Sequence, residues 1–146
     1  MFVPPAVSLL NALKIDQTIF EKGGRVEIPS GLLKLLLQIA LAAADFDEDG
    51  YLKENPDVAN ALGSGEIESA HVHFIGFGYF EGRQGAGPEV DEHWYMQKYP
   101  DVATAVREGR IRSARHHFHM IGAAEGRSPN RDQEDNAAQW KKALRS

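Results

Sequence analysis

The sequence predicts a mainly α-helical protein made of two tandem short-helix repeats with a 44-residue period, preceded by an N-terminal β-hairpin and an apolar helix. Residues 46–83 align with residues 90–127 without a gap, and 18 of the 38 positions are identical. The shared positions are helix-starting residues, Pro and Gly at short intervals, which is typical of short helices. Residues before 45 do not match the repeat and carry hairpin and helix signals of their own.

This pattern divides the chain into four segments that we expect to form one compact domain. Residues 1–45 are the expected oligomerisation segment, with the hairpin and the apolar helix. Residues 46–89 are the first repeat and residues 90–128 the second. Residues 129–146 are a polar C-terminal tail that could be helical.

Each repeat is expected to hold three short helices. The residues that start them are Asp47 and Asp91, Pro56 and Pro100, and Ser69 and Ser113. The expected core side chains include Tyr51 and Tyr95, Val58 and Val102, and Phe74 and Phe118. Gly78 and Gly122 are expected to end the third helix.

The N-terminal segment predicts self-association. Residues 18–28 alternate apolar and polar side chains about Gly23-Gly24, which favours a hairpin. The helix that follows, residues 31–44, is apolar nearly all round, apart from a stripe made by Lys34 and Gln38. Such a helix must be buried on several sides. We therefore expect a homo-oligomer whose interface contains Leu33, Leu36, Leu37, Ile19 and Val26.

Composition excludes several classes of function. The formal net charge is −5, which argues against nucleic acid as a partner, since phosphate binding needs a clustered basic surface. The absence of cysteine excludes disulfides and thiolate metal sites. The run 32–44 is too short to span a bilayer, and the N-terminus lacks a basic secretory signal. A cytoplasmic location is favoured, although a C-terminal export signal would escape these tests.

An acidic stretch at residues 45–57 resembles the start of a calcium loop. Asp45, Asp47, Asp49 and Gly50 fall at positions 1, 3, 5 and 6 of an EF-hand. Position 12, which must be a bidentate Glu, is Pro56. We therefore interpret the stretch as the charged start of a helix and predict no calcium site.

Histidine is the other unusual feature of the composition. His73 and His117 occupy the same repeat position and are expected to be buried imidazoles bonded to backbone or to a carboxylate. His116 and His119 are three residues apart and could supply half a metal site. The structural interpretation is favoured, so neither a metal nor a cofactor is predicted.

Ligand contacts are a weaker signal. Exposed rings could stack on sugars, and the repeated Glu-Gly-Arg could be a duplicated site; the candidates are Trp94, Tyr95, Tyr79, Arg83 and Arg127. Core packing of the rings is the favoured interpretation, together with a salt-bridged turn that locks one repeat against the next. No catalytic residue is predicted.

The two segments beginning YLKENPDVANAL and YMQKYPDVATAV, each ending in EGR, resemble a short bacterial repeat module. Similar repeats occur in RTX-type secreted or surface proteins and beside polysaccharide glycosyltransferases. The resemblance covers residues 46–127 and implies no catalytic residue.

The resulting hypothesis is a non-enzymatic interaction or assembly module, accessory to or regulating bacterial cell-surface polysaccharide production or export. A protein partner or a polysaccharide would be its ligand. Two alternatives remain open, a carbohydrate- or metal-binding protein and an unrecognised enzyme.

Overall fold

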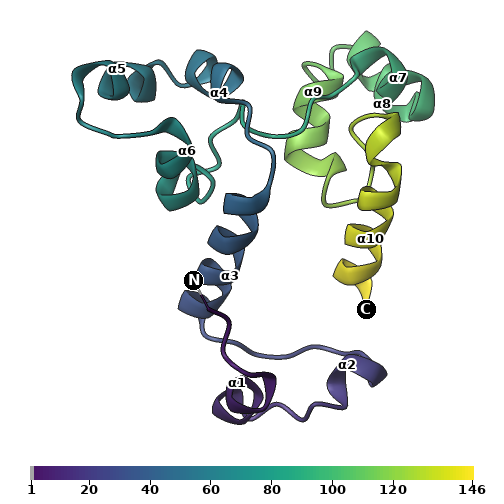
Figure 1. Ribbon diagram of the computed structural model, residues 1–146. Helices are drawn as coiled ribbons and strands as arrows, with labels where there is room; N and C mark the ends of the chain where they lie inside the picture. Colours follow the sequence, from purple (N-terminus) through teal and green to yellow (C-terminus); the bar gives the residue numbers. More distant parts are fainter. Residues whose placement is uncertain (1) are drawn as a thin grey trace. The chain divides into compact units, whose positions relative to one another are not determined.

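A computed structural model describes residues 2–146, and the fold is mainly α-helical, as predicted (Figure 1). No strand occurs within this range. The α-helices are α1 (Ala6–Leu13), α2 (Ile19–Lys22), α3 (Ser30–Ala43), α4 (Glu48–Glu54), α5 (Pro56–Ser64), α6 (Ala70–His73), α7 (Glu92–Lys98), α8 (Pro100–Arg107), α9 (Ala114–His117) and α10 (Glu134–Arg145). Two π-helical turns, η1 (Phe74–Gly78) and η2 (Phe118–Gly122), and a 3₁₀ turn, η3 (Arg131–Gln133), complete the set.

The chain forms two compact units rather than the single domain expected from its sequence. The first unit ends at Leu37 and the second runs from Gln38 to Arg145, so the boundary lies inside α3 and not at residue 45. The last turns of α3 belong to the second unit because they contact it: Gln38 Nε2 donates to the Ile75 carbonyl at 3.3 Å, and Leu41 packs against the core around Tyr51.

The N-terminal β-hairpin prediction is wrong. Residues 19–22 form α2, and residues 23–29 have no regular structure. Local bonds favour the helical turn: the Asp16 carboxylate accepts the Thr18 N–H at 2.8 Å, and the Gly23 N–H donates to the Ile19 carbonyl at 2.8 Å. An isolated two-stranded hairpin is marginal in water, and this segment offers no third strand.

Helix α3 is less covered than its composition predicts. None of its residues is buried, and Leu33, Leu35 and Leu36 are 44–48% exposed. Among the described residues of the first unit, Leu10 on α1 is the one hydrophobic residue that is buried. The expectation that α3 is surrounded on several sides is therefore not met by the chain's own residues.

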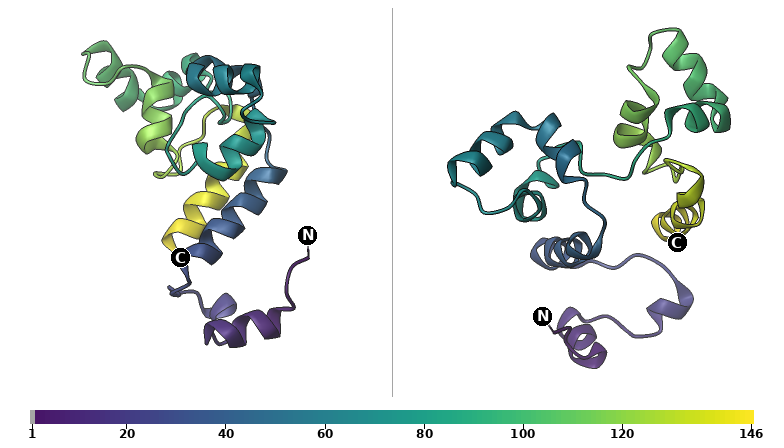
Figure 2. Two further views of the ribbon diagram at one scale, coloured as in Figure 1. Left: turned by 90° about the vertical axis from the view of Figure 1, so that its left-hand side faces the viewer. Right: turned by 45° about the horizontal axis from the view of Figure 1, so that its top comes forward.

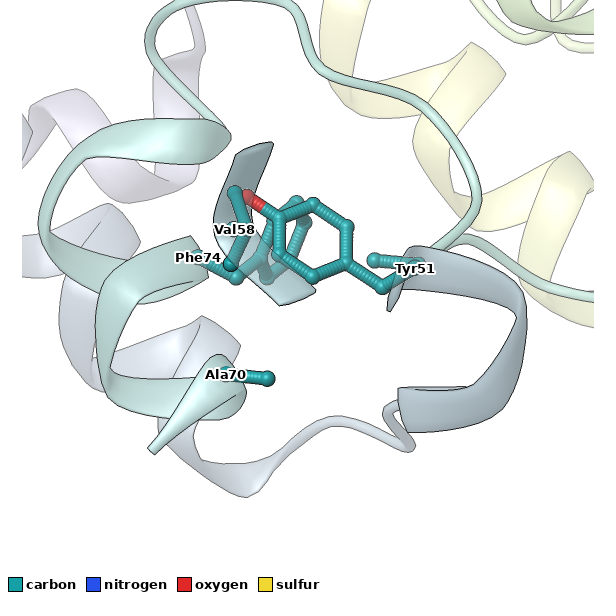
Figure 3. Packing of buried hydrophobic residues seen from close by; sticks show 5 residues of the cluster. Tyr51, Val58, Ala70 and Phe74 are labelled. Atoms are coloured by element: carbon teal, nitrogen blue, oxygen red, sulfur yellow. The ribbon is translucent and has the colours of Figure 1, made fainter. Parts of the chain in front are cut away.

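The first helical group of the second unit comprises α4, α5 and α6, which lie together in every view (Figure 2). Its core contains Tyr51, Val58, Ala70, Phe74 and Ala86. The Tyr51 ring extends from α4 towards Val58 and Phe74 and has no exposed surface (Figure 3). Leu41, Phe46 and other partly buried side chains close this core from its edges.

The second helical group comprises α7, α8 and α9 and has a core of matching composition. Val90, Tyr95, Val102, Ala114 and Phe118 are buried there. The predicted helix starts are confirmed in both groups: Asp47 and Asp91 accept N–H bonds as N-caps, Ser69 and Ser113 do the same, and Pro56 and Pro100 are the first residues of α5 and α8.

The π-helical turns follow α6 and α9 directly. In each, a backbone N–H bonds to the carbonyl five residues earlier, Tyr79 to Phe74 at 2.9 Å and Ala123 to Phe118 at 3.0 Å. Gly78 and Gly122 are the last residues of these turns, as predicted, and neither has a positive φ. Glycine is needed at both positions because a tyrosine hydroxyl lies where a Cβ would be.

The C-terminal tail is helical through η3 and α10. Asn130 caps η3 by accepting the Gln133 N–H at 3.1 Å, and Lys98 bonds Glu134 on α10 at 3.4 Å. Across residues 2–146, no helix is both long enough and apolar enough to cross a bilayer.

Candidate functional site

A buried tyrosine–histidine pair lies at the centre of the second group. Tyr95 on α7 has no exposed surface, and its hydroxyl lies 3.0 Å from His117 Nδ1 on α9. A Cβ on Gly122 would collide with that hydroxyl and would lie 3.1 Å from His117 Nδ1. Glycine is therefore required there because the π-turn backbone passes directly over the pair.

An ion-pair cluster ties the end of the same turn to α8. The Arg127 guanidinium donates two bonds to the Asp101 carboxylate, at 2.9 and 2.7 Å, and a third to Glu125 at 2.6 Å. It also lies over the Tyr99 ring, 4.9 Å from its centroid. Arginine is suited to this position because its planar fork binds a carboxylate in two places and stacks on an aromatic face.

The first group contains the same arrangement at positions 44 residues earlier. The Tyr51 hydroxyl lies 3.0 Å from His73 Nδ1, and Gly78 leaves room for that hydroxyl. Arg83 bonds Asp57 at 2.8 Å and Glu81 at 2.7 Å. These Arg bonds join parts of one group, so the predicted Glu-Gly-Arg lock between one repeat and the next is wrong.

The two groups differ in the hydrogen bond that fixes the residue after the arginine, which is Gln84 in the first group and Ser128 in the second. In the first, Asn55 Nδ2 donates to the Gln84 carbonyl at 2.9 Å. In the second, the Tyr99 hydroxyl accepts the Ser128 N–H at 2.8 Å. Asn55 and Tyr99 occupy equivalent positions at the 44-residue offset. Each fixes the residue after the arginine, although the two side chains differ.

Burial and ion pairing set the electrostatics of these clusters. Burial raises the pKa of Tyr95, and of Tyr51, above the usual value for a phenol. Burial, followed by the nearby Arg127 charge, lowers the pKa of His117. Hydrogen bonds from Arg127 lower the pKa of Asp101, and those from Arg83 lower the pKa of Asp57. The Tyr95–His117 pair is therefore held neutral beside a charged network.

An open hollow of about 520 Å³ has His117 in its lining, but not Tyr95. It lies between the start of α8 and the loop before α9, and its lining includes Asp101, Thr104, Arg110, Ile111 and His117. Thr104 Oγ1 donates to the Pro100 carbonyl at 3.0 Å, and Arg110 bonds Glu108 at 2.7 Å. The hollow gives water a route to the His117 side of the pair.

The predicted ligand residues do not share one surface. Tyr95 is part of the core and offers no ring face to a ligand. Trp94 is partly buried beside it, edge-on to Tyr99 and under Lys98 Nζ at 5.8 Å. Tyr79 is 42% exposed and packs edge-to-face on Phe80 and Phe74.

The charged candidates belong to the ion-pair clusters. Arg83 and Arg127 each bind one aspartate and one glutamate, and those bonds raise the pKa of each guanidinium. They act on the protein itself, so the duplicated Glu-Gly-Arg has a structural role in both groups.

The histidines are placed differently from expectation. His73 and His117 bond tyrosine hydroxyls, not backbone or a carboxylate. Burial lowers the pKa of His119, whose ring packs on Gly87, 3.0 Å from where a Cβ would lie. Within residues 2–146, no three His, Asp or Glu side chains gather as a metal site, and His116 and His119 belong to no such group.

The proposed interface residues remain accessible. Leu33 and Leu36 on α3 and Val26 in the loop before it are 46–48% exposed, and Leu37 and Ile19 are partly exposed. Ile19 and Val26 line an open hollow of about 560 Å³ in the first unit, together with Lys14, Lys22 and Arg25. No contact in the described chain assigns an occupant to these side chains.

The acidic stretch at residues 45–57 starts a helix, as interpreted. Asp47 Oδ1 accepts the Gly50 N–H at 2.9 Å and caps α4. Gly50 lies inside that helix, where a Cβ would meet the Gly85 carbonyl oxygen at 2.7 Å. The glycine therefore serves close backbone packing, not the sharp turn of a calcium loop.

Sequence reasoning missed the partners of Asp57, Asp101, Gly78 and Gly122. Each recurs at the 44-residue offset, and that recurrence was the available signal. The alignment could not say that aspartate meets arginine 26 residues later, or that glycine meets tyrosine 27 residues earlier, because neither contact is local.

Comparison with models of known protein families gives no match, and comparisons with curated proteins and with solved structures give none either. The contacts within the chain therefore carry the functional inference.

Proposed function

We propose that this protein is a non-enzymatic assembly module, in which the N-terminal unit and α3 bring copies together and the two helical groups each fold around a core of their own. The observation that carries the proposal is the exposure of α3. Leu33, Leu35 and Leu36 remain 44–48% exposed in a helix with no buried residue. Soluble monomers rarely keep a contiguous apolar face in water, so a second copy is the expected cover.

Tandem duplication supports a scaffold role for the rest of the chain. We infer that residues 46–83 and 90–127 are copies of one unit, because the Tyr–His distance is 3.0 Å in both and each Arg binds the equivalent Asp and Glu. The repeated polar side chains are bonded to one another. They therefore stabilise the groups and are not directed towards a substrate.

The test is the oligomeric state of the purified full-length protein. Light scattering at micromolar concentration should give a multiple of the 16.1 kDa chain mass. Leu33→Glu and Leu36→Glu should return the monomer. Lys34→Gln is the matched control, because it changes the net charge by the same amount on the polar stripe of α3 and should leave the assembly intact. A wild-type monomer would overturn the proposal.

The biological setting is proposed from the repeat resemblance alone. We place the protein in a bacterial cytoplasm as an accessory of cell-surface polysaccharide production or export. Deleting the gene in the source organism should lower surface polysaccharide, and the wild-type gene should restore it while Leu33→Glu should not. Unchanged polysaccharide would reject the setting without affecting the assembly test.

Carbohydrate binding is a second candidate, favoured by rings on the first copy. Phe77, Tyr79 and Phe80 are 40–62% exposed, whereas the equivalent second-copy residues are Ile121, Ala123 and Ala124. The fold therefore does not require rings at these positions. Calorimetry against oligosaccharides should detect binding that Tyr79→Ala weakens; no heat from any sugar would remove this candidate.

A further inference from the structure

We propose that Tyr95, His117 and Gly122 form an acid-sensitive latch, which holds α7 against α9 while His117 is neutral and opens when His117 takes up a proton. The hydroxyl of Tyr95 and Nδ1 of His117 are 3.0 Å apart in a core where Tyr95 is fully buried. A Cβ on Gly122 would meet both groups, so the backbone of η2 lies directly against the pair.

The chemistry of the bond explains the sensitivity. A neutral imidazole can accept the Tyr95 proton at Nδ1, but a protonated imidazole carries a hydrogen on both nitrogens and accepts at neither. The tyrosine hydroxyl would then lose its acceptor inside the core. The protonated ring can still donate its Nδ1–H to the phenol oxygen, but the Tyr95 O–H hydrogen is then left without an acceptor in the core. That unpaired donor and the buried cation are both unfavourable, so the closed arrangement is disfavoured by protonation.

The groups around His117 come from every element that packs on α9. They are Tyr95, Tyr99 and Glu92 from α7 and its end, Asp101 from α8, Arg110 from the loop before α9, His116 from α9 itself, His119 from η2, and Glu125 and Arg127 after it. Asp101 and Glu125 would favour a charged imidazole, but both are bonded to Arg127. The Arg127 charge and burial act in the opposite direction.

Protons reach the latch without global unfolding. His117 lines the open hollow of about 520 Å³, so water can approach the imidazole from one side while Tyr95 lies on the other. The pair therefore joins a fully buried tyrosine to a histidine that is also part of the lining of an open hollow.

The direction of the pH effect follows from linkage. The pKa of His117 is lowered from 6.5 in the closed state, mainly by burial and next by Arg127. The opened state therefore binds more protons as pH falls through 6.5. The latch is fully stable above this value and weakens below it, and the ratio of open to closed molecules rises by up to about tenfold per pH unit for one proton.

The chain provides a local probe for this test. It contains two tryptophans, and Trp94 packs beside the latch, edge-on to Tyr99. In a Trp140→Phe background, emission from Trp94 alone reports the second group. We expect a reversible change in this emission as pH falls below 6.5, with the protein otherwise helical by circular dichroism.

Two matched variants assign the change to one imidazole. His117→Asn removes the titrating ring and should abolish the change, whereas His73→Asn alters the equivalent pair of the first group and should retain it. Absence of the change in the Trp140→Phe protein, its persistence in His117→Asn, or its loss in both variants would overturn the proposal.

A second measurement needs no substituted protein. In the unmodified full-length protein, the His117 ring resonances followed by NMR should titrate below pH 6.5. Titration at or above 6.5 would overturn the latch, because the closed state would then accept the proton without cost.

Discussion

The hydroxyl of Tyr95 and Nδ1 of His117 lie 3.0 Å apart, and the same distance joins Tyr51 to His73 in the first helical group. The two pairs differ in environment: His117 is buried, whereas His73 is partly exposed. Identical bonds in unequal surroundings allow the effect of burial to be measured within one chain.

Removing the tyrosine hydroxyl should therefore cost more in the second group. Tyr95→Phe leaves a buried His117 nitrogen without its partner, and we expect a loss of about 1–3 kcal/mol in unfolding free energy. Tyr51→Phe should cost less, because His73 is more exposed than His117 and water can replace the lost hydroxyl more readily there. Urea denaturation of both variants decides this, and equal losses would contradict the role given to burial.

Gly122→Ala should destabilise the protein by placing a methyl group against the Tyr95 hydroxyl. Overpacking of this kind costs about 1–3 kcal/mol. The backbone there has no positive φ, so the penalty comes from the collision and not from strain. Combining Gly122→Ala with Tyr95→Phe should recover part of the loss in the same urea assay. A double variant that shows only the sum of the single losses would contradict the contact.

Phe118→Ala should lower the unfolding free energy by about 3–5 kcal/mol, and Phe74→Ala by a similar amount, since each empties part of a core. Phe77→Ala is the control. Its side chain is 62% exposed, and the change should stay within about 0.5 kcal/mol. Thermal and urea unfolding measure all three, and a near-neutral Phe118→Ala would show that the ring is not core.

Strong acid should weaken the Asp101–Arg127 pair. Its hydrogen bonds lower the pKa of Asp101 from 3.8, so the pair's contribution is present above that value and is lost as pH falls through the lowered pKa. The aspartate is largely exposed, which limits the contribution to about 0.2–1 kcal/mol. Asp101→Asn should remove this portion of the acid sensitivity in pH-dependent melts, whereas Asp135→Asn should not. Equal curves for the two variants would reject the assignment.

Calcium should not stabilise the protein. Asp47 already accepts the Gly50 N–H as a helix cap, and Pro56 stands where a calcium loop needs a bidentate glutamate. Millimolar calcium should therefore leave the melting temperature unchanged. Micromolar affinity by calorimetry would contradict this interpretation.

The local features of the fold could be predicted, and the contacts distant in sequence could not. Asp47, Ser69 and Pro56 were identified as helix starts because capping depends on neighbours one to three residues away. The Gly23-Gly24 pattern failed because a hairpin signal competes with local helical bonds and needs a third strand to win.

The candidate site shows the same limit. The sequence predicts Tyr95 both as a core residue and as a candidate ligand contact, because the identity of an aromatic residue does not reveal whether its ring is exposed. The His117 partner was missed because it lies 22 residues earlier on another helix. The 44-residue offset in the sequence pairs the residues of the two groups, but only the packing shows what each one contacts.

In the π-helical turns, the number of residues is more tightly constrained than the type of residue at each position. In each turn the backbone N–H bonds to the carbonyl five residues earlier, one residue further than in an α-helix. The number of residues in the turn therefore sets the direction in which the arginine after it points relative to the histidine before it. Deleting one residue of Phe118–Gly122 would rotate Arg127 by about 100° relative to His117. Arg127 would then point away from Asp101. Substitutions on the outer face of the turn should therefore be tolerated, since Phe77 and Ile121 are both largely exposed, whereas insertions and deletions within the turn should not be.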